Sequence, residues 1–234
     1  MSEEALEGAL RRLERANESL RDFAYGAAHD LKGPLEGIGH LAGFVLDDVG
    51  SSLPEASRCH LEDIRGRVEQ LSGLIDGLLE FATLRGEASP REFIDLSPLV
   101  QRVWKLWNAD SFTLVLSLDL PDIFAPPAAL LRVLSNVLGN AVMHHDRGSG
   151  VVTVETRDRP GCVELIIRDD GPGLSETIRG QAMEPLRTLH AGPRKGSGMG
   201  LALVERTMEQ LGGSVRLESA VPRGLSVILE WPKG

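Results

Sequence analysis

Residues 23–35 read FAYGAAHDLKGPL, and they lie within a long stretch whose apolar residues have helical spacing. N-terminal to His29 and just beyond it, these positions recur at alternating intervals of four and three residues, the heptad spacing of a helix that packs against a partner helix. The series is Leu6, Leu10, Leu13, Asn17, Leu20, Ala24, Ala27 and Leu31. A single polar residue in such a series, here Asn17, commonly fixes register and oligomeric state. The pattern predicts a long helix that forms a homodimer.

His29 falls at the outermost position of this heptad frame, so its imidazole ring is predicted to face solvent. Asp30 follows it directly. Pro34, five residues after His29, has no amide hydrogen to donate to the carbonyl of Asp30. We therefore expect the helix to bend beside an exposed histidine.

A second helix is predicted after a short loop. Apolar spacing resumes over 35–46, stops at the Gly, Ser and Pro residues of 50–54, and returns over 61–82. Two amphipathic helices joined by a short loop form a helical hairpin, and neither can bury its apolar stripe fully within one chain. Two hairpins would form a dimeric four-helix bundle.

The composition changes after Arg85, where Gly86, Ser89 and Pro90 indicate a linker. We assign residues 1–86 to the helical domain, 87–92 to the linker and 93–234 to a second domain. Helices are predicted there over 98–107, 128–143 and 201–211. Strands are predicted over 112–118, 151–156, 162–167, 215–218 and 225–230. The fold class is α+β.

Composition excludes several functions. The 234 residues carry a net charge of −9 and no basic stripe, which argues against nucleic-acid binding. No apolar run approaches the ~20 residues of a membrane span, and the N-terminus does not resemble a signal peptide, so we expect a cytoplasmic chain without membrane insertion. Cys59 and Cys162 form no ligand pattern, which leaves neither a disulfide framework nor a zinc site.

The motif HDLKGPL at 29–35 resembles the phosphoacceptor box of HisKA-type sensor histidine kinases, and the longer stretch 23–35 is most similar to the boxes of phytochrome-associated kinases. The unprotonated nitrogen of an exposed imidazole is a nucleophile near neutral pH. Without the surrounding motif, a single exposed histidine would be interpreted only as a surface residue. The resemblance implies that His29 takes the γ-phosphoryl group of ATP and passes it to an aspartate of a response regulator. Asp30 would orient the ring or accept its proton.

The stretch LSNVLGNAVMHH at 134–145 resembles the N box of the same kinases. Asn136 and Asn140 lie one turn apart on one helix face. The resemblance assigns Asn140 as a Mg²⁺ ligand, since an amide oxygen suits this cation, and places Asn136 beside it. Met143 stands where the family usually has a basic residue.

Two glycine motifs follow in the family's order. IIRDDGPGL at 166–174 matches a DxGxG box through Asp169, Gly171 and Gly173, in which the carboxylate would accept from the 6-amino group of adenine. GSGMGLALV at 196–204 resembles the second glycine box, whose backbone amides at a helix N-terminus can bind phosphate. Its glycines are Gly196, Gly198 and Gly200. Each motif taken alone is weak, and DGPG is also a common turn.

Order and spacing of the four motifs together indicate a two-component protein histidine kinase, with an α/β-sandwich ATP-binding domain as cofactor site. The segment MEPLR at 183–187 departs from the family's FEPF-like sequence. With Met143, this departure supports an alternative, a non-catalytic dimeric scaffold or phosphotransfer adaptor whose nucleotide domain has decayed. A serine kinase of the anti-sigma type would not explain the histidine box.

Gly33 occupies the position where related kinases that dephosphorylate their partners carry Thr or Asn to hold the attacking water. Glycine has no side chain for this task, so we expect weak phosphatase activity. Only some 20 residues precede the histidine box, which is compatible with an excised core or with a stand-alone kinase.

Overall fold

The computed structural model describes residues 3–83, 90–107, 109–185 and 198–232. The chain divides into two compact units, residues 1–85 and 86–234. Each unit is described by itself.

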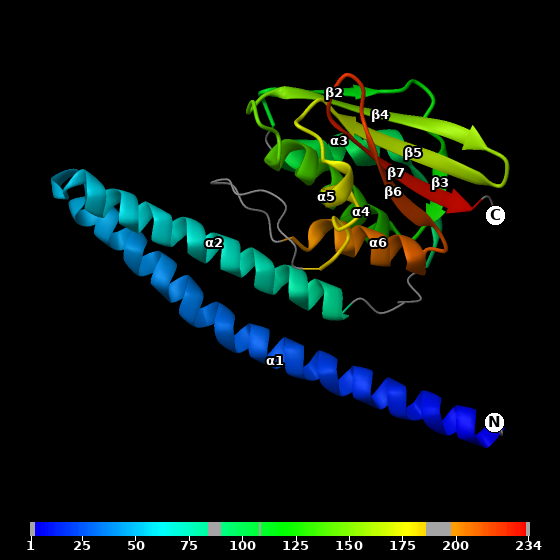
Figure 1. The fold of residues 1–234 in the computed structure, drawn as a ribbon, viewed down its shortest axis with the longest axis horizontal. Coiled ribbons are helices and arrows are strands. Elements are labelled where there is room, and N and C mark those ends of the chain that lie inside the picture. Colours follow the sequence, from blue (N-terminus) through cyan, green and yellow to red (C-terminus); the bar gives the residue numbers. More distant parts are fainter. Residues whose placement is uncertain (1–2, 84–89, 108, 186–197, 233–234) are drawn as a thin grey trace. The chain divides into compact units, whose positions relative to one another are not determined.

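The first unit is a helical hairpin of two long helices (Figure 1). Helix α1 spans Glu3–Val49, a 3₁₀ turn covers Gly50–Ser52, and helix α2 spans Glu55–Thr83. Pro34 lies inside α1 and does not end it. The helix curves along its length without interruption, so the predicted bend takes the form of a continuous arc rather than a break.

Small residues bring the two helices of the hairpin together. Ala28 and Ala42 are buried on α1, and Val68 is buried on α2. A Cβ atom at Gly39 would lie 3.0 Å from Cγ1 of Val68, so the helices approach closely where glycine stands. Lys32 of α1 also forms an ion pair with Asp76 of α2, at 2.6 Å.

The predicted heptad stripe is not the face that is buried within one chain. Leu31, expected in the core, is 57% exposed. The exposed apolar residues of α2 lie seven positions apart, so a stripe with coiled-coil spacing stays uncovered on the single chain. Its members in both helices are Leu31, Ile38, Leu41, Val45, Ile64, Leu71 and Leu78. The side chain of Asn17 lies outside the described residues.

The second unit packs helices against a five-stranded sheet with strand order β2-β4-β5-β7-β6 (Figure 1). The strands are β2 (Phe112–Leu116), β4 (Gly150–Arg159), β5 (Cys162–Asp169), β6 (Ser214–Ser219) and β7 (Leu225–Pro232). Strands β2 and β4 pair in parallel, and the other neighbours pair antiparallel. The last strand of the chain is therefore an inner strand of the sheet.

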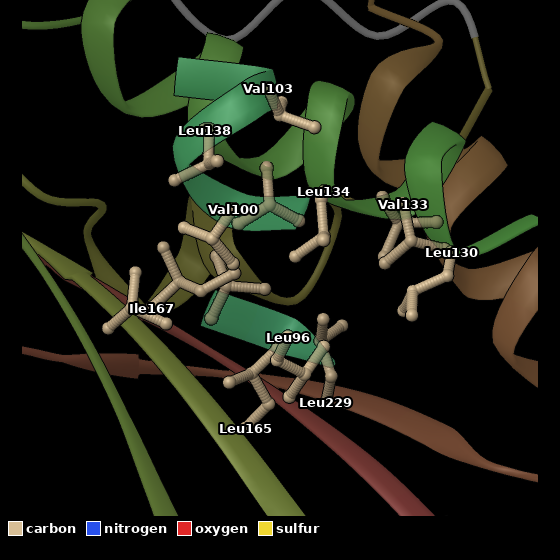
Figure 2. Close-up of a cluster of buried hydrophobic side chains, with 14 of the residues drawn as sticks. Leu96, Val100, Val103, Leu130, Val133, Leu134, Leu138, Leu165, Ile167 and Leu229 are labelled. Atoms are coloured by element: carbon tan, nitrogen blue, oxygen red, sulfur yellow. The ribbon is translucent and has the colours of Figure 1, made fainter. Parts of the chain in front are cut away.

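Three helices supply the apolar layer: α3 (Leu96–Leu106), α4 (Pro127–Met143) and α6 (Gly200–Gln210). Figure 2 shows the centre of this layer, where Leu165, Ile167 and Leu229 of the sheet lie with Val100 and Leu134 of the helices. Alternate residues of the strands face the two sides of the sheet. The predicted helices and hairpins of this unit are present, within a few residues of their predicted ends.

Two strands and a short helix were not predicted. Strand β1 (Glu92–Asp95) pairs antiparallel with β3 (Asp122–Ala125), and helix α5 spans Glu176–Arg179. Strand β1 begins at Glu92, the last residue assigned to the linker. Asp95 then caps α3, because its Oδ1 accepts a hydrogen bond from the Ser97 amide at 2.9 Å.

On the face of the sheet opposite the helices, a buried carboxylate lies among arginines. Glu164 accepts hydrogen bonds from Arg216 at 2.9 Å and Arg159 at 3.3 Å. Burial alone would raise the pKa of Glu164, but the hydrogen bonds from Arg216 and Arg159 outweigh it and lower the pKa. Arg157 lies at the edge of this cluster and is half-exposed.

Candidate functional site

His29 is exposed on α1, as predicted, and Asp30 is exposed beside it. Ala28 faces α2 and is 3% exposed, so the residue before the histidine fixes the inner side of the helix and His29 lies on its outer side. Gly33, one turn further, has open space around the position of a Cβ atom. This surface of α1 offers a nucleophile with free access.

Asp169 ends strand β5 and is the acidic residue of the first glycine motif. Its Oδ1 accepts hydrogen bonds from the Gly171 amide at 2.8 Å and the Leu225 amide at 3.3 Å. Burial raises the pKa of this carboxyl above its ordinary value, and the two amide hydrogen bonds oppose the rise. Among the described residues, these bonds go to Oδ1, so Oδ2 can accept from a ligand.

The glycines of the first motif pack directly against the turn before β7. Gly173 has φ +69°, and a Cβ there would lie 2.6 Å from the Gly224 carbonyl oxygen. Gly224 has φ +111°, and a Cβ on it would overlap the carbonyl oxygen of Asp169. Glycine is required at both positions because side chains would push the two segments apart.

Asn136 and Asn140 lie together on α4 beside the N-terminus of α6. A Cβ at Gly200 would lie 3.0 Å from Oδ1 of Asn136 and 3.4 Å from the amide group of Asn140. The amide nitrogen of Asn136 donates to the Arg132 carbonyl at 3.0 Å, which turns its oxygen toward Gly200. Because Gly200 has no side chain, the N-terminus of α6 packs directly against the amide groups of Asn136 and Asn140.

Gly198 lies just before α6 with φ +67°. Gly196 lies outside the described residues, as do Leu186 and Arg187 of the MEPLR segment. The second glycine motif is therefore placed by its last two glycines.

The loop after α4 contacts the segment that follows β5 through His145. The side chain of His145 is fully buried, and its Nε2 lies 3.1 Å from Oδ1 of Asp170. Its Nδ1 accepts from the Arg147 amide at 3.2 Å, so Nε2 carries the proton and donates to Asp170. His145 thus has a structural role in this loop.

Asp170 also accepts from the Val151 amide at 2.7 Å. Burial would raise the pKa of Asp170, but the hydrogen bonds from Val151 and His145 lower it overall. The carboxylate next to Asp169 is thereby held at the start of β4.

Sequence reasoning missed Arg223. Its Nε donates to the Gly171 carbonyl at 2.8 Å, and its Nη2 donates to both carboxylate oxygens of Asp146, at 2.9 and 2.8 Å. This hydrogen bonding lowers the pKa of Asp146. No local motif marks Arg223, since only the pairing of β7 with β5 brings it to Gly171.

The structure brings the predicted binding residues together in two groups. Asp169, Gly171 and Gly173 lie against the turn before β7, and Asn136 and Asn140 lie beside Gly200 at the start of α6. His29 and Asp30 belong to the other unit. An adenine-sized group beside Asp169 and phosphates near Gly200 would fit the chemistry of these donors and acceptors.

Fold and site define a nucleotide-binding domain joined to a helical phosphoacceptor hairpin. Residues 125–234 match the model of the histidine kinase-, DNA gyrase B- and HSP90-like ATPase family. Residues 19–87 match the His Kinase A (phospho-acceptor) domain. The chain therefore carries both domain types named for the histidine kinases.

Curated relatives agree with this family. Over 220 residues the chain is 28% identical to cyanobacterial phytochrome B of Nostoc sp., covering 91% of this chain and 29% of the relative. It is 29% identical over 231 residues to the histidine-protein kinase/phosphatase MprB of Mycobacterium ulcerans, covering 94% and 45%. The chain thus spans less than half the length of these relatives.

Among solved structures, the fold matches full-length ShkA, crystallised in complex with AMPPNP, with a TM-score of 0.64 and 24% identity. The match covers 90% of this chain and 45% of that one. Within the described ranges, none of the helices has the length and apolar character needed to cross a membrane.

Proposed function

We propose that this chain is the kinase core of a two-component system, which phosphorylates itself on His29 from ATP and passes the phosphoryl group to a response-regulator aspartate. One observation carries the proposal. The same chain holds an exposed histidine in a phospho-acceptor domain and, in an ATPase-family domain, a carboxylate and two amides arranged for a nucleotide.

For nucleotide binding, we assign Oδ2 of Asp169 as the acceptor for the adenine 6-amino group. The backbone around Gly171 and Gly173 would approach the base, because neither residue carries a side chain. Phosphates would lie at the N-terminus of α6, near Gly198 and Gly200, with Gly196 completing the glycine motif.

Asn140 would hold Mg²⁺, with Asn136 beside it. The fit is supported by the two amide groups that face the bare Cα of Gly200. When bound, the cation neutralises charge on the phosphates during transfer.

Phosphoryl transfer then requires an in-line approach of His29. A ring nitrogen forms a bond to the γ-phosphorus while the bond from that phosphorus to the β–γ bridging oxygen breaks, and ADP leaves with the electron pair. The ring proton passes to the carboxylate of Asp30 or to water. Positioning and charge neutralisation supply most of the rate enhancement in such reactions.

We also propose that the chain acts as a homodimer in the cytoplasm, where ATP and receiver domains are found. The uncovered stripe that includes Leu31, Ile38 and Leu71 supports the dimer, because a second hairpin would cover it and form a four-helix bundle. The exposed face of α1 around His29 would then receive the receiver domain of the response regulator.

The test is incubation with γ-labelled ATP. The wild-type chain should acquire acid-labile, base-stable label, and His29→Ala should acquire none. His40→Ala is the matched control, since His40 is also exposed on α1, and it should keep the label. Label that persists in His29→Ala would refute the assignment.

A decayed nucleotide domain remains the competing proposal, favoured by Met143 in place of a basic residue. It predicts no ATP binding. Measurable ATP affinity that is lost in Asp169→Ala, together with Mg²⁺-dependent tightening that is lost in Asn140→Ala, would exclude it.

A further inference from the structure

The carboxylate of Asp169 depends on two segments that lie far apart in sequence. Its donors are the amides of Gly171 and Leu225, so the position of Oδ2 is set by the loop after β5 and by the start of β7. Movement of either segment would turn the ligand-facing oxygen away from its place.

The glycines of these segments have no side chains with which to hold the segments together. Gly171, Gly173 and Gly224 carry none, and glycine has more conformational freedom to lose than any other residue. The two backbones fit closely, but a side-chain contact is needed to keep the two segments in register.

Arg223 supplies such a contact. One edge of its guanidinium donates to the Gly171 carbonyl, on the same residue whose amide donates to Asp169. The other edge donates to both carboxylate oxygens of Asp146, in the loop that also carries His145. Two residues later the Leu225 amide completes the contact with Asp169. A planar fork can make both bonds at once, which a lysine ammonium cannot.

We propose that Arg223 is a positioning residue for adenine recognition: by joining the Gly171 carbonyl to Asp146, it holds Asp169 where Oδ2 meets the 6-amino group. This inference rests on the proposed function. Arg223 does not touch the nucleotide, and its effect passes through Gly171. Its loss should therefore appear as weaker discrimination between bases rather than as unfolding.

Base discrimination gives a readout that a merely structural role would not move. Inosine triphosphate carries an oxygen at the 6-position, which accepts where the adenine amino group donates. The wild-type chain of residues 1–234 should bind ATP at least about tenfold more tightly than inosine triphosphate, as expected for a hydrogen bond to a charged group.

Arg223→Gln should lower this ATP preference about fivefold, with the affinity for inosine triphosphate nearly unchanged. The melting temperature should change little, because an ion pair at this exposure contributes little to stability. Arg157→Gln is the control: it also removes a partly exposed arginine, but on the face of the sheet opposite the helices, and it should leave the preference intact.

A charge-swapped double variant, Asp146→Arg with Arg223→Asp, separates the ion pair from the carbonyl contact. It can restore the pair, but an aspartate at 223 cannot donate to Gly171, so the ATP preference should stay low. Full recovery in the double variant would overturn the proposal, as would an unchanged preference in a folded Arg223→Gln chain. Absence of ATP binding by the wild type would instead contradict the proposed function.

Discussion

Asp169 combines two opposing demands in one side chain. Burial raises its pKa, so the folded chain holds the carboxyl proton more tightly than the unfolded chain does. Between the unfolded and folded pKa values the folded state binds more protons, and stability falls as the pH rises through this window. Above the folded pKa, the ionised carboxylate therefore lowers stability, although it is the form that would accept from adenine in the proposed function.

Substitution of Asp169 by asparagine should separate these demands. In Asp169→Asn the amide oxygen can keep both backbone hydrogen bonds, whereas the amide nitrogen would face the adenine amino group as a second donor. We expect ATP affinity to fall roughly tenfold or more while the melting temperature stays the same or rises. Calorimetric titration and thermal unfolding measure the two effects, and unchanged ATP binding would remove Asp169 from the adenine site.

The raised pKa of Asp169 also predicts a pH dependence. As the pH is lowered, this carboxyl gains its proton before a carboxyl with the ordinary aspartate pKa does. The preference for ATP over inosine triphosphate should therefore weaken before ordinary aspartates titrate. Binding of both nucleotides across a pH series tests this, and Asp169→Asn should show a flat profile. A wild-type preference that is constant down to the ordinary aspartate range would contradict it.

At the scale of the element, helix α1 has a glycine, Gly33, one turn after His29. A Cβ at Gly33 meets nothing within 4 Å, so a larger side chain can be accommodated there. The weak phosphatase activity predicted for this chain follows from the missing side chain, although relatives of the MprB type carry the name kinase/phosphatase.

Gly33→Thr should therefore accelerate the decay of purified phospho-regulator in the presence of ADP, because a hydroxyl could orient the attacking water. Loss of such positioning commonly costs factors of ~100, so the gain should be large. Gly37→Thr, one turn further along α1, also meets open space and is the control. A strong acceleration by the wild-type chain would show that Gly33 is not limiting.

Strong periodicity made the long helices predictable. The heptad spacing gave α1 and α2, and the alternation of apolar residues gave the hairpins of the sheet, because burial on one face is written directly into local sequence. Strands β1 and β3 could not be found in this way. Each has four residues, and their pairing joins segments whose neighbours in sequence fold elsewhere.

The same distinction holds for the candidate site. Asp169 and its glycines stand in a recognisable local motif, whereas Arg223 and Leu225 enter the site only through the pairing of β7 with β5. The turn PRGL at 222–225 signals a turn and nothing about its partner. Contacts made by long-range strand pairing leave no periodic trace in sequence.

At the scale of the whole molecule, self-association should belong to the first unit. Residues 1–85 carry the uncovered stripe, so a fragment ending at Arg85 should sediment as a dimer and residues 86–234 as a monomer. In the full chain, Leu71→Glu should favour the monomer, and Glu69→Lys, on another face of α2, should not. Sedimentation equilibrium measures each species, and a dimeric 86–234 fragment would refute the bundle.

The inner position of β7 affects how a newly made chain acquires its site. This strand follows the other four strands of the sheet in sequence, yet it lies between β5 and β6 and brings the Leu225 amide to Asp169. A nascent chain in which β7 has not yet been made lacks an inner strand of the sheet and one of the two amides that hold Asp169. ATP in the proposed reaction would thus bind only the finished domain, which it would stabilise by about 2.7 kcal/mol at a hundredfold excess over its Kd. The phosphoryl donor would also act as a ligand that selects fully synthesised, folded kinase.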